Sequence, residues 1–187
     1  MSALPVISDV PRHHPDCCLS LSTRLVWQIG QHHLPGSTII SIGSGSGLLE
    51  ALLQEQYPRT RVIGVEVNDM VNKYLSPGNS TTVKGTWDIY DKSSKDDTWL
   101  FVYPRSSGLI SRYLQLLTVP RSILWLGPRK DWEEFRSPFL AFGDFGIEEI
   151  GDAGLASYET MFVMKREDLQ LSEDTAKRFD ISQIDDI

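Results

Sequence analysis

Three glycines and one acid have the spacing of a nucleotide-binding site. The loop Gly43-Ser44-Gly45-Ser46-Gly47 follows the apolar run 38–42 and precedes the helix-forming stretch 48–56. A second apolar run, 61–65, ends at Glu66. Because glycine has no Cβ, its backbone can turn at positive φ and approach a ligand closely. The pattern predicts a strand, a ligand-binding loop, a helix and a second strand whose terminal carboxylate can accept hydrogen bonds from ribose hydroxyls.

The spacing of the glycines separates two ligand classes. A dinucleotide fingerprint reads G-x-G-x-x-G, whereas this loop reads G-x-G-x-G and has Leu48 where that fingerprint has its third glycine. Together with Glu66, the loop resembles that of the class I S-adenosylmethionine-dependent methyltransferases. The resemblance implies that the loop lies against the methionine part of S-adenosylmethionine and that Glu66 binds the ribose. Glycines between a strand and a helix also serve as plain turn residues, so the acid at the strand end is what favours a cofactor.

The resemblance places the cofactor contacts at the ends of three strands. The expected contacts are Ser41, Gly43, Gly45, Gly47, Glu66, Val67, Thr86 and Trp87. Ser41 departs from the family pattern, which often has an acid two residues before the first glycine. Thr86 or Asp88 would replace an Asp that often lies beside the adenine, and Trp87 could stack on the base. The stretch 103–105 lacks the Asn/Asp-Pro-Pro-aromatic signature of amino-group methylation.

Two residues are candidates for catalysis. Methyl transfer depends mainly on alignment of the acceptor with the sulfonium, but a hydroxyl or amine acceptor gains from a base. Tyr103 follows the expected fourth strand, and His14 lies in a segment that often covers the cofactor in this family. Tyr103 can equally be a core aromatic with its hydroxyl at the surface. No metal site is expected, because the adjacent Cys17 and Cys18 cannot easily converge on one tetrahedral ion.

Alternating strands and helices must position these residues. We expect strands at 38–42, 61–66, 81–83, 98–103, 122–126, 145–151 and 159–165, and helices at about 22–33, 48–56, 69–75, 107–117 and 131–136. The order predicts an α/β fold: one Rossmann-like domain of three layers over residues 20–166, with a mostly parallel sheet and an antiparallel C-terminal strand. Residues 1–19 are expected to form an irregular segment or lid, and 167–187 an acidic tail.

Composition narrows the classes of partner. The net charge is −7, and residues 167–187 hold seven acids against two basic residues. No basic stripe suited to nucleic acid is evident, and no apolar run reaches the roughly 20 residues of a membrane span. The two adjacent cysteines and the absence of a signal-peptide pattern favour a cytoplasmic location.

These observations lead to one functional hypothesis and two alternatives. The hypothesis is S-adenosylmethionine-dependent methylation of a small molecule, without a nucleic-acid or membrane partner; the oligomeric state is left open. A non-methylating member of the same fold, acting as a binding or partner module or as another enzyme, is favoured by the departures at Ser41 and 103–105. An NAD-dependent oxidoreductase is opposed by Leu48 and by the lack of a Tyr-x-x-x-Lys motif.

Overall fold

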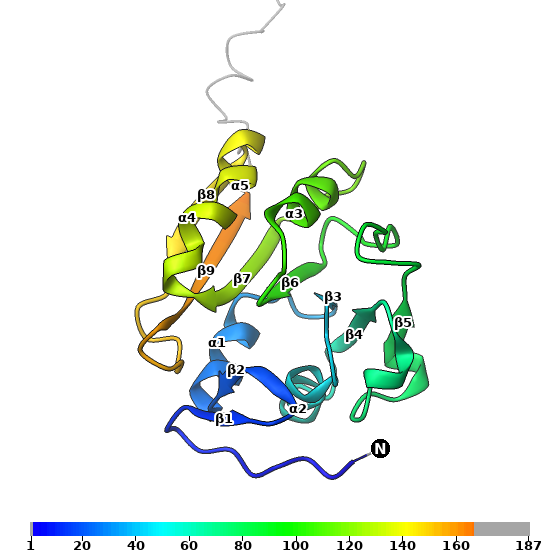
Figure 1. The fold of residues 1–187 in the computed structure, drawn as a ribbon, viewed down its shortest axis with the longest axis vertical. Helices are drawn as coiled ribbons and strands as arrows, with labels where there is room; N and C mark the ends of the chain where they lie inside the picture. The colour runs from blue at the N-terminus through cyan, green and yellow to red at the C-terminus, as the bar shows by residue number, and fades with distance from the viewer. Residues whose placement is uncertain (1, 167–187) are drawn as a thin grey trace, which may run out of the picture.

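A seven-stranded β-sheet organises the chain, of which a computed structural model describes residues 2–166 (Figure 1). The strands of this sheet are β3 (Thr38–Ile42), β4 (Arg61–Glu66), β5 (Ser80–Thr82), β6 (Thr98–Val102), β7 (Ser122–Pro128), β8 (Phe145–Glu149) and β9 (Glu159–Arg166). Their order across the sheet is β5-β4-β3-β6-β7-β9-β8. The predicted acidic tail, residues 167–187, lies outside the described residues.

The direction of the strands confirms the predicted fold class. β3 pairs in parallel with β4 on one side and with β6 on the other, and β5 and β7 extend this parallel arrangement. β9 is antiparallel to both of its neighbours, β7 and β8. The order of the strands reverses between β3 and β6, and ligands of open α/β sheets bind outside the carboxyl ends of the strands at such a point.

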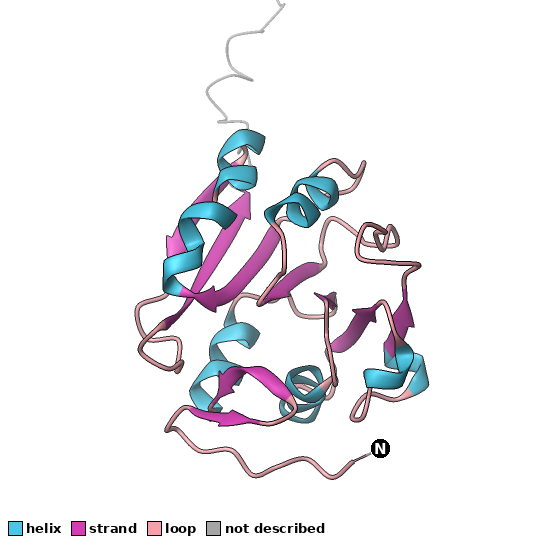
Figure 2. Ribbon diagram, in the orientation of Figure 1, coloured by secondary structure: helices cyan, strands magenta, loops and turns pink. Residues whose placement is uncertain are grey.

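Helices cover both faces of the sheet, which gives the three predicted layers. The α-helices of residues 2–166 are α1 (Thr23–Gln31), α2 (Leu48–Gln56), α3 (Ser107–Leu114), α4 (Trp132–Phe135) and α5 (Ser137–Phe142). Figure 2 shows α1 and α2 on the opposite side of the strands from α3, α4 and α5. Because side chains alternate along a strand, neighbours such as Trp125 and Leu126 belong to two different cores. No helix within residues 2–166 is long and apolar enough to cross a membrane.

Most predicted helices are present, with shifts at their ends. Of the two serines that could begin the first helix from the sequence, Ser20 and Ser22, it is Ser22 that begins α1, since its Oγ accepts a hydrogen bond from Leu25 N at 3.0 Å. The predicted helix 69–75 is only the 3₁₀ turn η1 (Asp69–Val71). Two further 3₁₀ turns are η2 (Pro77–Asn79) and η3 (Arg129–Asp131). The predicted helix 107–117 ends three residues early, because Leu117 is fully exposed and gains nothing from helical packing.

The N-terminal region contains a β-hairpin, so the prediction of an irregular segment over residues 1–19 is wrong for its second half. Strand β1 (Arg12–His14) pairs antiparallel with β2 (Cys17–Leu21). Leu19 and Leu21 are buried at 0% and 3% exposure. The prolines that suggested irregular structure lie before β1 and in the turn between the strands, where the missing N–H costs little.

Candidate functional site

The glycine loop has the backbone conformation that only glycine adopts easily. Gly43, Gly45 and Gly47 have φ values of +79°, +56° and +79°. A Cβ on Gly43 or Gly45 would meet no protein atom within 4 Å, whereas one on Gly47 would lie 2.8 Å from Leu75 Cγ. Gly47 is therefore needed both for its φ and for packing at the start of α2, while Gly43 and Gly45 border open space that a ligand can fill.

Glu66 lies beside the loop and holds it. Strands β3 and β4 pair in register, with Ile42 opposite Val65, so that Glu66 comes level with the first glycine. Its Oε1 accepts a hydrogen bond from Gly45 N at 3.1 Å, and its Oε2 accepts one from Val67 N at 2.8 Å. A carboxylate offers about four lone-pair positions, so Glu66 can hold the loop and still accept hydrogen bonds from ribose hydroxyls.

The adenine side of the expected site is open to solvent. Val67 and Trp87 are 44% and 64% exposed, and Thr86 is exposed as well. The Trp87 indole lies against Gly85, where a Cβ would come within 2.6 Å of the ring. Asp88 accepts hydrogen bonds from Lys84 N at 2.8 Å and Ile89 N at 3.0 Å, which lower the pKa of its carboxyl group. The Asp88 carboxylate thus caps its own loop, and the expected stacking of Trp87 on a base stays a prediction.

Beneath the loop, Ser41 contacts an acid that sequence reasoning missed. Ser41 is fully buried, and its Oγ donates a hydrogen bond to Glu50 Oε1 at 2.5 Å. Glu50, in the first turn of α2, is 2% exposed, and its Oε2 has no hydrogen-bond partner. Burial raises the pKa of Glu50 to about 7. The signal for Glu50 was a single acid within the otherwise apolar stretch 48–53.

On the acceptor side, Tyr103 is strained and anchored. Its φ of +47° is the one positive φ among the non-glycine residues that the structure describes. Tyr103 N donates to Leu126 O at 2.8 Å, and its hydroxyl donates to Glu159 Oε1 at 2.7 Å. Burial, and then the bond to Glu159, raise the pKa of the Tyr103 phenol, so it stays protonated at neutral pH. An unfavourable backbone conformation held by specific contacts is common at functional sites.

Glu159 forms the centre of a buried polar network. The side chain is 2% exposed, and its carboxylate accepts hydrogen bonds from Ser20 N and Ala156 N, both at 3.2 Å. Ser20 Oγ and the Tyr103 hydroxyl donate to the same carboxylate. The network joins the N-terminal hairpin, the end of β6 and the start of β9.

The β1–β2 hairpin lies directly on the glycine loop. Ser46 Oγ donates to the backbone oxygen of Asp16 at 2.6 Å, and Tyr74 donates its hydroxyl to Asp16 Oδ2 at 2.8 Å. Lys73 forms an ion pair with the same carboxylate, which lowers the pKa of Asp16. His14 lies in this hairpin, and its Nδ1 accepts a hydrogen bond from Asp16 N at 3.2 Å. Its predicted catalytic role, like that of the hairpin as a lid, stays a prediction.

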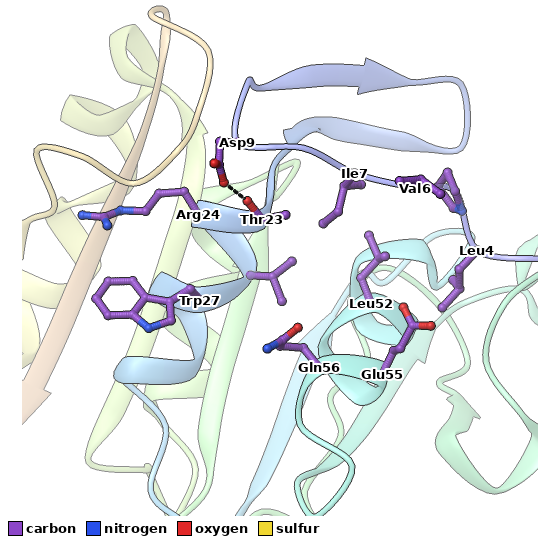
Figure 3. A pocket seen from close by; sticks show the side chains of 12 residues that line it. Leu4, Val6, Ile7, Asp9, Thr23, Arg24, Trp27, Leu52, Glu55 and Gln56 are labelled. Atoms are coloured by element: carbon purple, nitrogen blue, oxygen red, sulfur yellow. Dashed lines mark hydrogen bonds between the residues drawn. The ribbon is translucent and has the colours of Figure 1, made fainter.

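A separate cavity of about 640 Å³ lies between the N-terminal segment and helices α1 and α2. Figure 3 shows Leu4, Val6 and Ile7 of the N-terminal segment on one side of it, with Leu52 of α2 below and Trp27 of α1 opposite. Residues of the glycine loop are not among those that line this cavity. Within residues 2–166, no three His, Cys, Asp or Glu side chains converge as metal ligands.

Comparisons with known proteins give a clear result for the fold alone. No protein-family model and no curated protein sequence matches the chain. Among solved structures, the precorrin-6y C5,15-methyltransferase of Geobacter metallireducens GS-15 matches with a TM-score of 0.61 at 13% identity, over 88% of this chain and 100% of that chain. The chain has the class I methyltransferase fold.

Other proteins with the methyltransferase fold differ in size. Human N-acetylserotonin methyltransferase in complex with SAM matches with a TM-score of 0.54 at 11% identity, over 76% of this chain. The present chain spans 50% of that enzyme's length. At such low sequence identity, the similarity establishes the fold but not the role of any residue in the site.

The similar structures correct the expectation about partners. The Mtq2-Trm112 complex of E. cuniculi, responsible for the methylation of the translation termination factor eRF1, matches with a TM-score of 0.55 at 12% identity over 85% of this chain and 99% of that chain. Its acceptor is a protein, and a fibrillarin/Nop5p complex has the same fold. The restriction to a small-molecule acceptor without nucleic acid is therefore wrong, because this methyltransferase fold does not limit the class of acceptor.

Proposed function

We propose that the chain binds S-adenosylmethionine at the carboxyl ends of β3, β4 and β5 and transfers its methyl group to an acceptor. The observation that carries the proposal is the glycine loop, in which Gly43 and Gly45 hold positive φ next to open space and beside the Glu66 carboxylate. In this assignment the loop lies against the methionine part, Glu66 binds the ribose and Trp87 stacks on the adenine. The bound cofactor would supply an electrophilic methyl group on its sulfonium.

Tyr103 would act at the acceptor as part of a pair with Glu159. Because the phenol has a raised pKa, it is a poor base by itself. Its hydroxyl donates to the Glu159 carboxylate at 2.7 Å, which leaves the phenol oxygen free to accept a hydrogen bond from an acceptor O–H or N–H. The acceptor's proton can then pass to Tyr103 while the phenol's own proton moves to Glu159. His14 on the hairpin is the second candidate base.

A non-methylating protein that binds the same cofactor is the second candidate. Its supporting observation is that both departures from the family pattern are structurally engaged: Ser41 is buried against Glu50, and the Tyr103 hydroxyl is bound to Glu159. An NAD-binding role is weaker. Leu48, which stands where the dinucleotide fingerprint has glycine, is 1% exposed and belongs to the hydrophobic core.

Calorimetric titration tests the proposal. We expect saturable binding of S-adenosylmethionine and of its demethylated product, and no binding of NAD. Incubation with methyl-labelled S-adenosylmethionine and separated protein, RNA and small-molecule fractions would then identify the class of acceptor. Binding without any labelled product would support the non-methylating candidate, and no binding at millimolar cofactor would refute both.

A further inference from the structure

A buried carboxyl group with an unsatisfied oxygen lies beneath the glycine loop. Glu50 is 2% exposed, and the side-chain hydrogen bond that its carboxyl group accepts among residues 2–166 comes from Ser41 Oγ, to Oε1 at 2.5 Å. Its Oε2 is buried without a partner, and no lysine or arginine of residues 2–166 forms an ion pair with it. Leaving a buried polar group half satisfied costs stability. A residue that costs stability next to a ligand-binding loop is a candidate for a role in binding.

The groups that surround Glu50 are negative or neutral. Its pKa is raised first by burial and then by the negative charge of Glu66 at the end of β4. Glu50 in turn contributes to the raised pKa of the Cys17 thiol on β2, for which burial is the largest cause. Glu50 on α2 thus faces β2 of the hairpin and the end of β4, and no basic side chain of residues 2–166 forms an ion pair with it.

A second buried acid, Glu159, offers a useful contrast. Ser20, Ala156 and Tyr103 all donate hydrogen bonds to its carboxylate, and both of its oxygens accept at least one. Glu159 is thus satisfied by the protein itself. Glu50 has the same exposure of 2%, but within residues 2–166 its one side-chain donor is the Ser41 hydroxyl. Of these two acids, it is Glu50 that needs a donor from outside.

We propose that Glu50 binds the positively charged ammonium group of the cofactor's amino-acid end. This inference rests on the proposed function. Where the family pattern often has an acid, this chain has the small Ser41 side chain. That side chain leaves room for the Glu50 carboxylate, which reaches it from α2. An ammonium donor would satisfy Oε2 and supply the absent positive charge, as a charge-assisted hydrogen bond. Because Glu50 is 2% exposed, we expect the β1–β2 hairpin to shift when the cofactor enters.

The test uses two ligands that differ in their amino-acid end. S-adenosylmethionine carries the ammonium group, whereas 5′-methylthioadenosine has the same adenosine and sulfur but no amino-acid end. We expect Glu50→Gln to weaken binding of S-adenosylmethionine by about 10- to 100-fold, and to leave binding of methylthioadenosine within about twofold. Retained binding of methylthioadenosine also shows that the variant is folded.

Glu55→Gln is the matched control, since Glu55 is an exposed acid on the same helix. We expect this control to bind both ligands as the wild type does. The inference is overturned if Glu50→Gln binds S-adenosylmethionine as tightly as the wild type, or if it loses affinity for both ligands equally. If the wild type binds neither ligand, the proposed function fails as well, so the two failures are distinguishable.

Discussion

The two faces of the sheet are built from different side chains. On the face covered by α3, α4 and α5, large aromatic rings pack together: Trp125 lies 5.1 Å from Trp132 and 5.6 Å from Phe135, measured between ring centroids. The face covered by α1, α2 and the hairpin is mainly aliphatic. It also contains the buried polar side chains Ser20, Ser22, Ser41, Glu50 and Glu159.

This difference separates stability from function. Apolar burial and ring packing stabilise the aromatic face, on which Trp99 Nε1, Trp125 Nε1 and Arg166 Nε are buried without a hydrogen-bond partner. The aliphatic face carries the strained Tyr103 and the half-satisfied carboxyl group of Glu50, which cost stability and are candidates for a role in binding. We therefore expect substitutions on the aromatic face to lower the free energy of unfolding, and substitutions on the aliphatic face to lower the affinity for S-adenosylmethionine.

Truncating an aromatic ring on the stabilising face should have the largest effect. Trp125 is fully buried, so Trp125→Ala should lower the free energy of unfolding by about 3–5 kcal/mol. Affinity for S-adenosylmethionine, measured where the variant is still folded, should not change. Trp87→Ala is the control with the opposite expectation: an exposed ring whose loss weakens cofactor binding and leaves chemical denaturation unaltered. A loss of affinity in Trp125→Ala would show that the faces are coupled.

A side chain in the glycine loop should act mainly on binding. Gly45→Val places a branched Cβ in open space that we assign to the cofactor, at a φ of +56°. We expect affinity to fall by at least about 100-fold, against a stability cost of roughly 1–3 kcal/mol from the unfavourable φ. Gly36→Val is the matched control, because Gly36 has a φ of +84° and no protein atom within 4 Å of its added Cβ. Equal titration curves for wild type and Gly45→Val would reduce the glycines to turn residues.

Removing the carboxylate of Glu66 should produce a smaller loss of affinity. Glu66→Ala deletes the acceptor for Gly45 N and the expected ribose contact. Loss of a charge-assisted hydrogen bond should cost about 1.5–3 kcal/mol of binding free energy. The fold should persist, as judged by circular dichroism. Unchanged calorimetric affinity would remove Glu66 from the site.

The half-satisfied Glu50 should give the free protein a characteristic dependence on pH. Its pKa rises from 4.5 to about 7 on folding, so the native state binds more protons between these values. The contribution of Glu50 to stability is complete below about pH 4.5 and is lost as pH rises to 7, a change on the order of 3 kcal/mol. Melting curves of wild type and Glu50→Gln should diverge over this range, with the variant the more stable at pH 7.5. Parallel curves would show that the pKa of the Glu50 carboxyl does not differ between the folded and unfolded states.

Local patterns predicted much of this structure, and contacts distant in sequence explain what they missed. The glycine spacing, the apolar runs and the acid at Glu66 are local, and they predicted the loop, the strands and the fold class. The β1–β2 hairpin was missed because its stability comes from partners such as Glu159, far along the chain. Helix α5 was missed because it follows α4 after a single residue.

The residues of the site divide in the same way. Glu50 occupies an apolar stretch, and nothing in the sequence shows that its carboxylate turns toward Ser41. The acceptor for the Tyr103 hydroxyl, Glu159, lies 56 positions away. The sequence therefore predicted the glycine loop but not the buried carboxylates Glu50 and Glu159.

The hairpin has a consequence for the order in which the chain assembles. It leaves the ribosome before every strand of the sheet, yet Ser20 bonds to a residue 139 positions later and His13 contacts one 145 positions later. Contacts of such long sequence separation form late, because the intervening chain must first close a loop. A nascent chain that ends at β7 holds the glycine loop and Ser46 but not the start of β9. The contacts of Asp16 with Ser46, Lys73 and Tyr74 join residues much closer in sequence, whereas the hairpin's bonds to Tyr158 and Glu159 can form only after the start of β9 has been made.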